Sequence, residues 1–406
     1  MVDFTVNLKP SNKPLVQGCP GVPKTYPTIN STLEIRSISN QQILIDHIVI
    51  KFVTIDSFLK GKPRDVPSSV KKINYEYTTK INDRLISMDL PFLIGLQNEL
   101  CPTSSNFKVS TEHFLEVAIN HGTNGKLLKT VEFPIIITTF DTLPLYRQFN
   151  QLVTKTVDSK DHNVILEYSL PTNAIGLTEE LNINLKILNN QSQIKKIDRI
   201  KLKKISSSLI EVFDCRCDKS FIKETVIQTH SKDYSATLGL KGINEQIIIK
   251  FDDESIFEKF KIFNKHEDID LMKRRHPPQN IQLNSQDLKA QIIQNGTLSI
   301  PLNQYGNITK KSNLFNIYFE LKILLKFSGA KDIEIRQPVT ISFFDRIKSL
   351  KLLKWIMKET ELSLEFLNRL ESEIGRIKFN NKYNVLEYPQ RKPIILRSKE
   401  DKDKFL

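Results

Sequence analysis

The chain of 406 residues is poor in cysteine, in glycine and in long apolar runs, and each shortage excludes a class of protein. The four cysteines are Cys19, Cys101, Cys215 and Cys217. They form no CxxC pair, so zinc ribbons and thioredoxin-type chemistry lack support. Glycine, at 13 residues, is scarce enough to argue against glycine-rich phosphate loops and collagen-like repeats. No run of about 18 apolar residues occurs, so no transmembrane helix is expected.

The sequence also lacks the motifs of catalysis and of metal binding. The seven histidines form no HxH or HExxH pair, and the serines at 206–208 have no GxSxG frame around them. We therefore expect a protein that is not an enzyme and has no catalytic residues, no metal and no cofactor. The segment 1–10 is polar rather than apolar, so it does not resemble a signal peptide, and a cytoplasmic location is expected.

Positive charge is what the chain has in excess. Lysine and arginine total 59 against 46 acidic residues, a formal net charge of +13. A hydrophobic share of 39% with a charged share of 26% is typical of a globular protein with an ample core. A basic surface suits lipid headgroups, phosphorylated segments or nucleic acid. Because the basic residues are not interleaved with aromatic ones, nucleic acid is the least favoured of these partners.

An internal repeat divides the chain into two related halves. FLEVAI at 114–119 and PIIITTFD at 134–141 match YFELKI at 318–323 and PVTISFFD at 338–345, with no gap between the two blocks. Each pair of blocks is typical of two β-strands around a turn that contains glycine, with the proline at the start of a strand. The repeat therefore predicts an equivalent β-hairpin in each half.

Strands with turns between them dominate the rest of the sequence, which is typical of β-sandwiches rather than of βαβ units. We predict an all-β fold of two sequential sandwiches with a C-terminal amphipathic helix, whose apolar residues recur three and four apart. The helix is expected to pack on the second sandwich or the interdomain groove, with a membrane surface as the alternative. The expected boundaries are 1–145 for the first sandwich, 146–165 for a linker, 166–345 for the second sandwich with an exposed insertion at 251–275, 346–380 for the helix and 381–406 for a flexible basic tail.

Three short segments give the chain a family resemblance. PGVP at 20–23, VEFPI at 131–135 and IRQPVTI at 335–341 resemble positions of the arrestin-like family, in particular of fungal arrestin-related (alpha-arrestin-like) trafficking proteins, and the resemblance covers residues 15–345. It implies two immunoglobulin-like sandwiches and a non-enzymatic adaptor that links membrane cargo proteins to a ubiquitin ligase or to sorting machinery in trafficking or signalling. The alternative is a retromer-like sorting-coat subunit, and a nucleic-acid- or phosphate-binding β module is less favoured.

A candidate ligase-docking motif lies where the two sandwiches would join. Leu143, Pro144 and Tyr146 form LPxY, a variant of the PPxY motif through which that family recruits WW-domain ubiquitin ligases. A proline that favours an extended segment, followed by a tyrosine, suits the aromatic groove of a WW domain. The alternative is a rigid linker whose apolar side chains pack against both sandwiches. No PPxY motif lies in the tail, which weakens the ligase-adaptor interpretation.

A basic segment in the second half is a candidate site for anionic lipid or for a phosphorylated partner. Its members are Lys195, Lys196, Arg199, Lys201, Lys203 and Lys204. Alternation places Arg199, Lys201 and Lys203 on one face of a strand. Such a face would attract lipid headgroups and hold the protein at the periphery of the plasma membrane or of endosomes. A solvated outer face of a sheet is the alternative.

Overall fold

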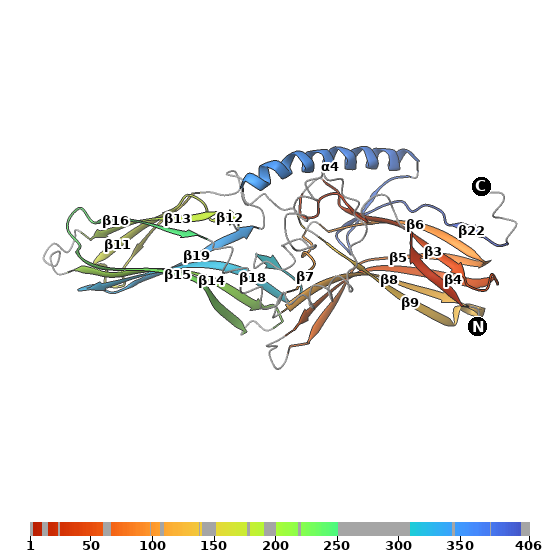
Figure 1. Ribbon diagram of the computed structural model, residues 1–406, viewed down its shortest axis with the longest axis horizontal. Helices are drawn as coiled ribbons and strands as arrows, with labels where there is room; N and C mark the ends of the chain where they lie inside the picture. Colours follow the sequence, from red (N-terminus) through yellow and green to blue (C-terminus); the bar gives the residue numbers. More distant parts are fainter. Residues whose placement is uncertain are drawn as a thin grey trace.

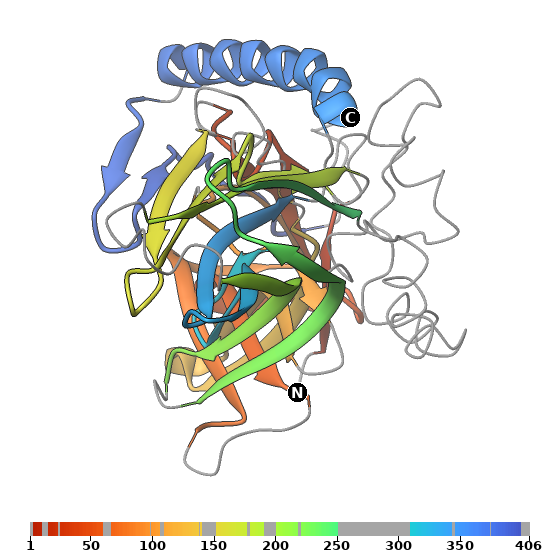
Figure 2. The same cartoon turned by 90° about the vertical axis from the view of Figure 1, so that its left-hand side faces the viewer.

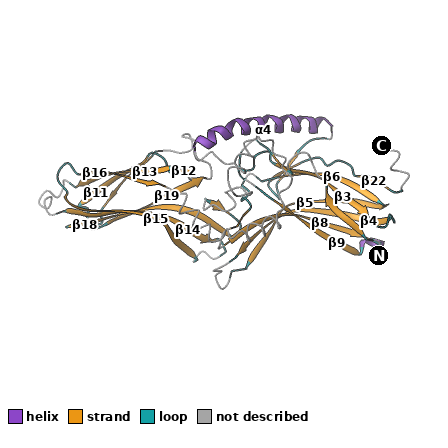
Figure 3. Cartoon of the chain, in the orientation of Figure 1, coloured by secondary structure: helices purple, strands orange, loops and turns teal. Residues whose placement is uncertain are grey.

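The structure, a computed structural model, consists of two β-sandwiches that lie end to end, with one long helix outside them (Figures 1 and 3). It describes residues 3–9, 15–22, 25–59, 66–97, 99–105, 109–137, 139, 152–176, 179–190, 200–217, 221–250, 309–342, 346–373 and 375–398. The all-β fold with a C-terminal helix that the sequence predicts is confirmed.

The first sandwich pairs two antiparallel sheets over one apolar core. One sheet has the order β1–β3–β6–β22, with β2 beside β3: Phe4–Leu8, Thr28–Ser37, Ser87–Gly95, Ile394–Leu396 and Val16–Gln17. The other has the order β5–β4–β8–β7, with β9 beside β8: Ser69–Leu85, Ile43–Phe58, Val109–His121, Ser104–Ser105 and Leu127–Ile135. A register shift in β4 between Ile45 and His47 lets both Ile45 and Ile48 face the core, because the extra residue restores the alternation.

The second sandwich also packs two sheets over one core. Its smaller sheet has the order β10–β11–β13–β16: Val153–Asp158, Val164–Leu170, Glu180–Asn189 and Ile243–Lys250. The larger has the order β12–β19–β18–β14–β15, with β17 beside β18: Ala174–Gly176, Ile333–Ser342, Phe315–Ser328, Lys201–Cys215, Ile222–Thr237 and Lys310–Lys311. The described strand pairs of this sandwich are antiparallel except for β12 with β19, which are parallel. Buried and half-buried residues alternate along most of β18, so one face of this strand supplies the core and the other faces outward.

The two hairpins predicted from the internal repeat are confirmed. Strands β8 and β9 pair antiparallel, and so do β18 and β19. The predicted position of the prolines at strand starts is wrong: Pro134 is the penultimate residue of β9, and Pro338 lies inside β19. Among the described strands, β9 pairs only with β8, and β12 joins β19 only from Thr340 onward. On the side away from its hairpin partner, each proline thus has no neighbour among the described strands, and its missing N–H breaks no described ladder.

Two predicted boundaries differ from the structure. Strand β10 begins at Val153, inside the range 146–165 expected as a linker; it is a short and largely exposed edge strand, which gives a weak sequence signal. Helix α4 spans Arg346–Glu373 and so ends before residue 380. The insertion expected at 251–275 lies outside the described residues.

The C-terminal segment is not a flexible tail in its described part, which corrects the prediction for 381–406. After α4 the chain forms a hairpin of β20 (Lys378–Asn380) and β21 (Val385–Glu387), and β22 then pairs antiparallel with β6 of the first sandwich. Helix α4 runs along the outside of the molecule towards the first sandwich (Figures 1 and 2). There Leu370 packs with Leu93 and Tyr388, so this end of the helix is held by the first sandwich rather than the second.

Candidate functional site

Much of each predicted site lies outside the described residues. This holds for the whole LPxY motif, Leu143, Pro144 and Tyr146, and for Lys195, Lys196 and Arg199 of the basic segment. The structure therefore leaves the docking motif as a prediction. It describes the other half of the basic segment, Lys201, Lys203 and Lys204, at the start of β14.

The described lysines of β14 have a further lysine beside them on the neighbouring strand β18. Lys201 and Lys203 are exposed, as alternation with the buried Leu202 predicts. A register shift between Leu202 and Lys204 turns Lys204 to a half-buried position, where its Nζ lies 3.9 Å from Asp233 Oδ1. Lys204 lies directly opposite Lys326 of β18, which is exposed and which the linear basic segment could not reveal. We call Lys201, Lys203, Lys204 and Lys326 the lysine strip.

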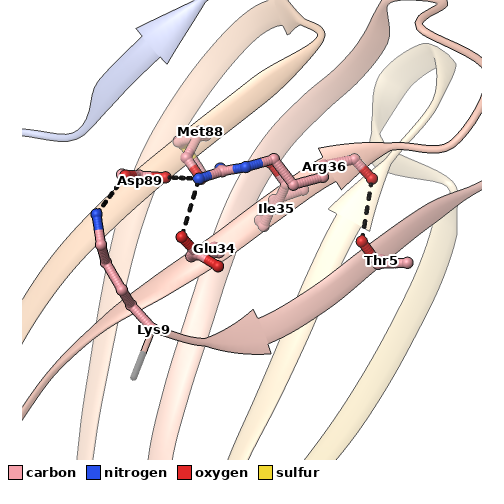
Figure 4. A network of polar contacts seen from close by, with 7 residues as sticks. All are labelled: Thr5, Lys9, Glu34, Ile35, Arg36, Met88 and Asp89. Atoms are coloured by element: carbon pink, nitrogen blue, oxygen red, sulfur yellow. Dashed lines mark hydrogen bonds and ion pairs between the residues drawn. The ribbon is translucent and has the colours of Figure 1, made fainter. Parts of the chain in front are cut away.

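The outer face of β3 and β6 in the first sandwich offers a contrast, because its charges are paired. Figure 4 shows Arg36 of β3 reaching across to the carboxylate of Asp89 on β6. The Arg36 guanidinium also donates to Glu34 Oε1 at 3.1 Å and to the Met88 carbonyl at 2.8 Å. Lys9 Nζ lies 3.6 Å from Asp89 Oδ2. These cations already have carboxylate partners, so this network supports the β3–β6 register rather than a site for anions.

A buried carboxylate joins the two sandwiches. Asp56 of β4 is fully buried, and its Oδ1 accepts a hydrogen bond of 2.7 Å from the Thr111 hydroxyl. Its Oδ2 accepts from the backbone and side-chain amides of Asn313, at 2.8 and 3.1 Å. Asn313 lies between β17 and β18 of the second sandwich. The domain junction therefore depends on one side chain that satisfies donors from both sides.

Apolar contacts accompany this polar link. The rings of Phe58 and Phe213, one from each sandwich, have centroids 6.0 Å apart. Val66 and Val109 of the first sandwich belong to the apolar cluster that forms the core of the second. The two sandwiches consequently share part of one core, which argues for a defined relative placement rather than a loose tether.

The C-terminal strands are fixed to the first sandwich by polar contacts as well as by pairing. Arg397 forms an ion pair with Asp83 at 2.7 Å, and the hydrogen bonds from Arg397 lower the pKa of Asp83. Gln390 Nε2 donates to the Leu93 carbonyl at 2.8 Å, and Gln390 Oε1 accepts from the Leu93 backbone N–H at 3.0 Å. This segment thereby closes the edge of β6, which would otherwise expose unpaired backbone groups.

No group of three or more histidine, cysteine, aspartate and glutamate side chains in the described ranges could hold a metal ion. In the same part of the chain, no helix has the length and apolar character needed to cross a lipid bilayer.

Fold and surfaces together define an all-β protein of two joined sandwiches whose C-terminal segment returns to the first. No protein-family model matches the chain. The chain is similar to RHO1 GEF localizing protein 1 of Saccharomyces cerevisiae: the two are 24% identical over 463 residues, which cover 97% of this chain and 92% of the relative. The similarity thus extends over nearly the full length of both proteins.

Proposed function

We propose that the chain is a non-enzymatic, arrestin-like scaffold that localises a guanine nucleotide exchange factor for a Rho-type GTPase. The observation that carries the proposal is the near full-length similarity to a protein whose name describes the localisation of such a factor. The paired sandwiches support an arrestin-like assignment, since they follow the order and the repeated hairpins that led to that resemblance. Fold alone does not assign the partner, so the partner rests on the relative.

An exposed edge of the second sandwich supports a binding role. Among the described strands, β15 pairs only with β14, so it forms an edge of the larger sheet in the described part of the chain. Ile222 and Val226 on this strand are each 54% exposed. Edge strands of this kind accept an extended segment of a partner by β-strand addition, with apolar side chains supplying specificity. We propose that the exchange factor binds here.

We further propose that the lysine strip holds the scaffold at an anionic membrane. Each basic residue near such a surface contributes about 1 kcal/mol. Replacing Lys201 and Lys203 with glutamine should therefore weaken binding to phosphatidylserine vesicles roughly thirtyfold, as measured by sedimentation. The control is Lys80→Gln with Lys126→Gln, two exposed lysines of the first sandwich. An equal loss in both double variants would show that only the net charge matters.

The scaffold function can be tested by replacement in yeast. Saccharomyces cerevisiae cells without RHO1 GEF localizing protein 1 would receive either this chain or the yeast protein, together with a fluorescent RHO1 exchange factor. We expect this chain to restore the position of the exchange factor. If the factor stays displaced although the chain is present at the level of the yeast protein, the proposal is wrong for this partner.

Purification from native cytosol tests the alternatives that the sequence left open. The proposal expects an exchange factor among the bound proteins, and expects Tyr146→Ala to leave that binding unchanged. A HECT-type ligase with ubiquitylated membrane proteins, lost in Tyr146→Ala, would favour the ligase adaptor. Fixed stoichiometric partners with neither ligase nor exchange factor would favour the coat subunit.

A further inference from the structure

A pocket of about 720 Å³ lies where the two sandwiches meet the C-terminal hairpin. Its wall includes Asn74 of β5, Arg216 after β14 and Tyr388 after β21, and so draws on three parts of the chain that are far apart in sequence. Small-molecule sites in proteins usually measure about 300–1,000 Å³ and lie at domain interfaces. Size and position are thus those of a ligand site.

The pocket is rich in positive charge. The cationic residues of its wall are Lys72, Arg216, Lys311 and Lys382, and Glu99 is the one acidic residue among the lining residues of the described chain. Lys72 Nζ lies 3.4 Å from Gln97 Oε1, and Arg216 donates to the Ser312 carbonyl at 2.7 Å. Within the described ranges, none of the four cations has an ion pair with a carboxylate, in contrast to Arg36 on the outer face of β3. An anion could therefore take the place of the missing partners.

Two buried polar atoms of the pocket wall have no hydrogen-bond partner among the described residues. His113 Nε2 lies 2.9 Å from the Cys101 carbonyl, which can only accept, so Nε2 carries the hydrogen. The other ring nitrogen, Nδ1, lies 2.8 Å from Thr54 Oγ1, and Thr54 Oγ1 accepts from the Asn74 amide at 2.6 Å. The Asn74 side chain thus donates through Nδ2 to Thr54, while Asn74 Oδ1 has no hydrogen-bond partner in the described structure.

The second such atom is the hydroxyl of Tyr388, which is also without a partner among the described residues. Tyr388 is 3% exposed and Asn74 is 2% exposed, so both polar atoms belong to nearly buried side chains of the wall. Unpartnered buried polar groups are uncommon in folded proteins and call for an explanation. A ligand with hydroxyl groups would explain both, because a hydroxyl donates to an amide oxygen and accepts from a tyrosine.

We propose that this pocket binds a small phosphorylated polyol, either free or as the headgroup of a lipid. The phosphate groups would contact Lys72, Lys311 and Lys382, and the hydroxyl groups would reach Asn74 and Tyr388. Because the wall spans both sandwiches and the C-terminal hairpin, the bound ligand fastens the three together. The inference goes beyond the scaffold function, and it neither requires nor tests the exchange factor.

The experiment is isothermal titration calorimetry of the full chain with inositol trisphosphate at physiological ionic strength. We expect saturable binding of one ligand per chain and a rise in the melting temperature of the ligand-bound protein. Lys72→Gln combined with Lys311→Gln should raise Kd at least about a hundredfold, because each of the two lost charge-assisted hydrogen bonds is worth about a factor of ten or more. The melting temperature without ligand checks that the double variant is folded.

The control is Lys160→Gln combined with Lys241→Gln, which removes the same charge from exposed turns of the second sandwich. It should bind inositol trisphosphate as the unaltered chain does. Vesicles with phosphatidylinositol bisphosphate, compared with phosphatidylserine vesicles of equal charge, distinguish a lipid headgroup from a free ligand. The proposal is overturned if neither the soluble probe nor the phosphoinositide is bound in preference to its control, or if both double variants lose binding equally.

Discussion

Asp56 is the single residue whose removal should most directly weaken the domain junction. Replacing it with alanine leaves the fully buried Thr111 hydroxyl and both amide donors of the half-buried Asn313 without this acceptor. An unsatisfied buried donor costs about 1–3 kcal/mol, so the free energy of unfolding should fall by at least this amount. Urea unfolding measures it. Asp233→Ala, at a side chain 85% exposed, is the control and should change stability by less than about 0.5 kcal/mol.

The ion pair between Asp83 and Arg397 gives a pH-dependent prediction. Hydrogen bonds from Arg397 lower the pKa of Asp83 below its value of 3.8 in an unfolded chain. A lowered pKa in the folded state stabilises the protein above pH 3.8, and the effect is lost as the pH falls through the folded pKa. Since Arg397 is 62% exposed, solvent screening limits the contribution to about 0.2–1 kcal/mol.

Asp83→Asn should therefore lower the free energy of unfolding at neutral pH, and the loss should be smaller at an acidic pH below 3.8, because Asp83 becomes increasingly protonated in both states as the pH falls. Urea unfolding at the two pH values provides the comparison. Arg397→Gln should show the same loss at neutral pH. A loss in Asp83→Asn that persists unchanged at low pH would mean that the pair is not its origin.

For single residues, the sequence shows which side chains are charged but not which of them lie together in the folded protein. Lys201 and Lys203 were predicted to face outward, and they do, because alternation along a strand is a local property. A register shift brings Lys204 onto the outward face as well, where it lies opposite Lys326 of another strand. The pocket cations Lys72, Lys311 and Lys382 come from three distant segments, so no spacing rule could have connected them.

Among the structural elements, the docked C-terminal hairpin offers the sharpest test. A Cβ atom added at Gly95 of β6 would lie 2.4 Å from the Leu386 carbonyl oxygen of β21, too close for both strands to keep their places. Gly95→Ala should displace the hairpin, with a loss of about 1–3 kcal/mol of unfolding free energy, the range of overpacked cores. Limited proteolysis should then cut the C-terminal segment faster.

The matched control is Gly239→Ala, where an added Cβ would meet no atom within 4 Å. This variant should resist both urea and protease as the unaltered chain does. Equal behaviour of the two variants would contradict the close approach of β21 to β6, and with it the return of the C-terminal segment to the first sandwich.

The elements that the sequence predicted well are the ones with a long or repeated signal. The hairpins β8–β9 and β18–β19 share a sequence pattern that occurs twice in the chain. The apolar residues of α4 recur at helical spacing over several turns. Strands β20, β21 and β22 have three residues each, which is too short for alternation to be recognised. Their position is set by contacts such as that of Leu93 with Tyr388, and tertiary contacts of this kind leave no local pattern.

For the whole molecule, the shared core predicts that the two sandwiches unfold together. Val66 and Val109 lie in the core of the second sandwich, and β22 ties the end of the chain to the first. Calorimetry should therefore show one transition whose calorimetric and van't Hoff enthalpies agree. Two resolved transitions in the unaltered chain would mean that the junction contacts are too weak to couple the sandwiches.

A substitution at Phe213 can distinguish a loss of coupling between the two sandwiches from a loss of stability in the second sandwich alone. It is 2% exposed and packs against Phe58 across the junction as well as against Phe315 in its own sandwich. Both Phe213→Ala and the control Phe319→Ala, at a side chain 1% exposed inside the second sandwich, should lose about 3–5 kcal/mol. Only Phe213→Ala also removes an interdomain contact, so only this variant should split the single calorimetric transition into two. If both variants split it equally, destabilising the second sandwich is sufficient and the Phe58–Phe213 contact carries no special coupling.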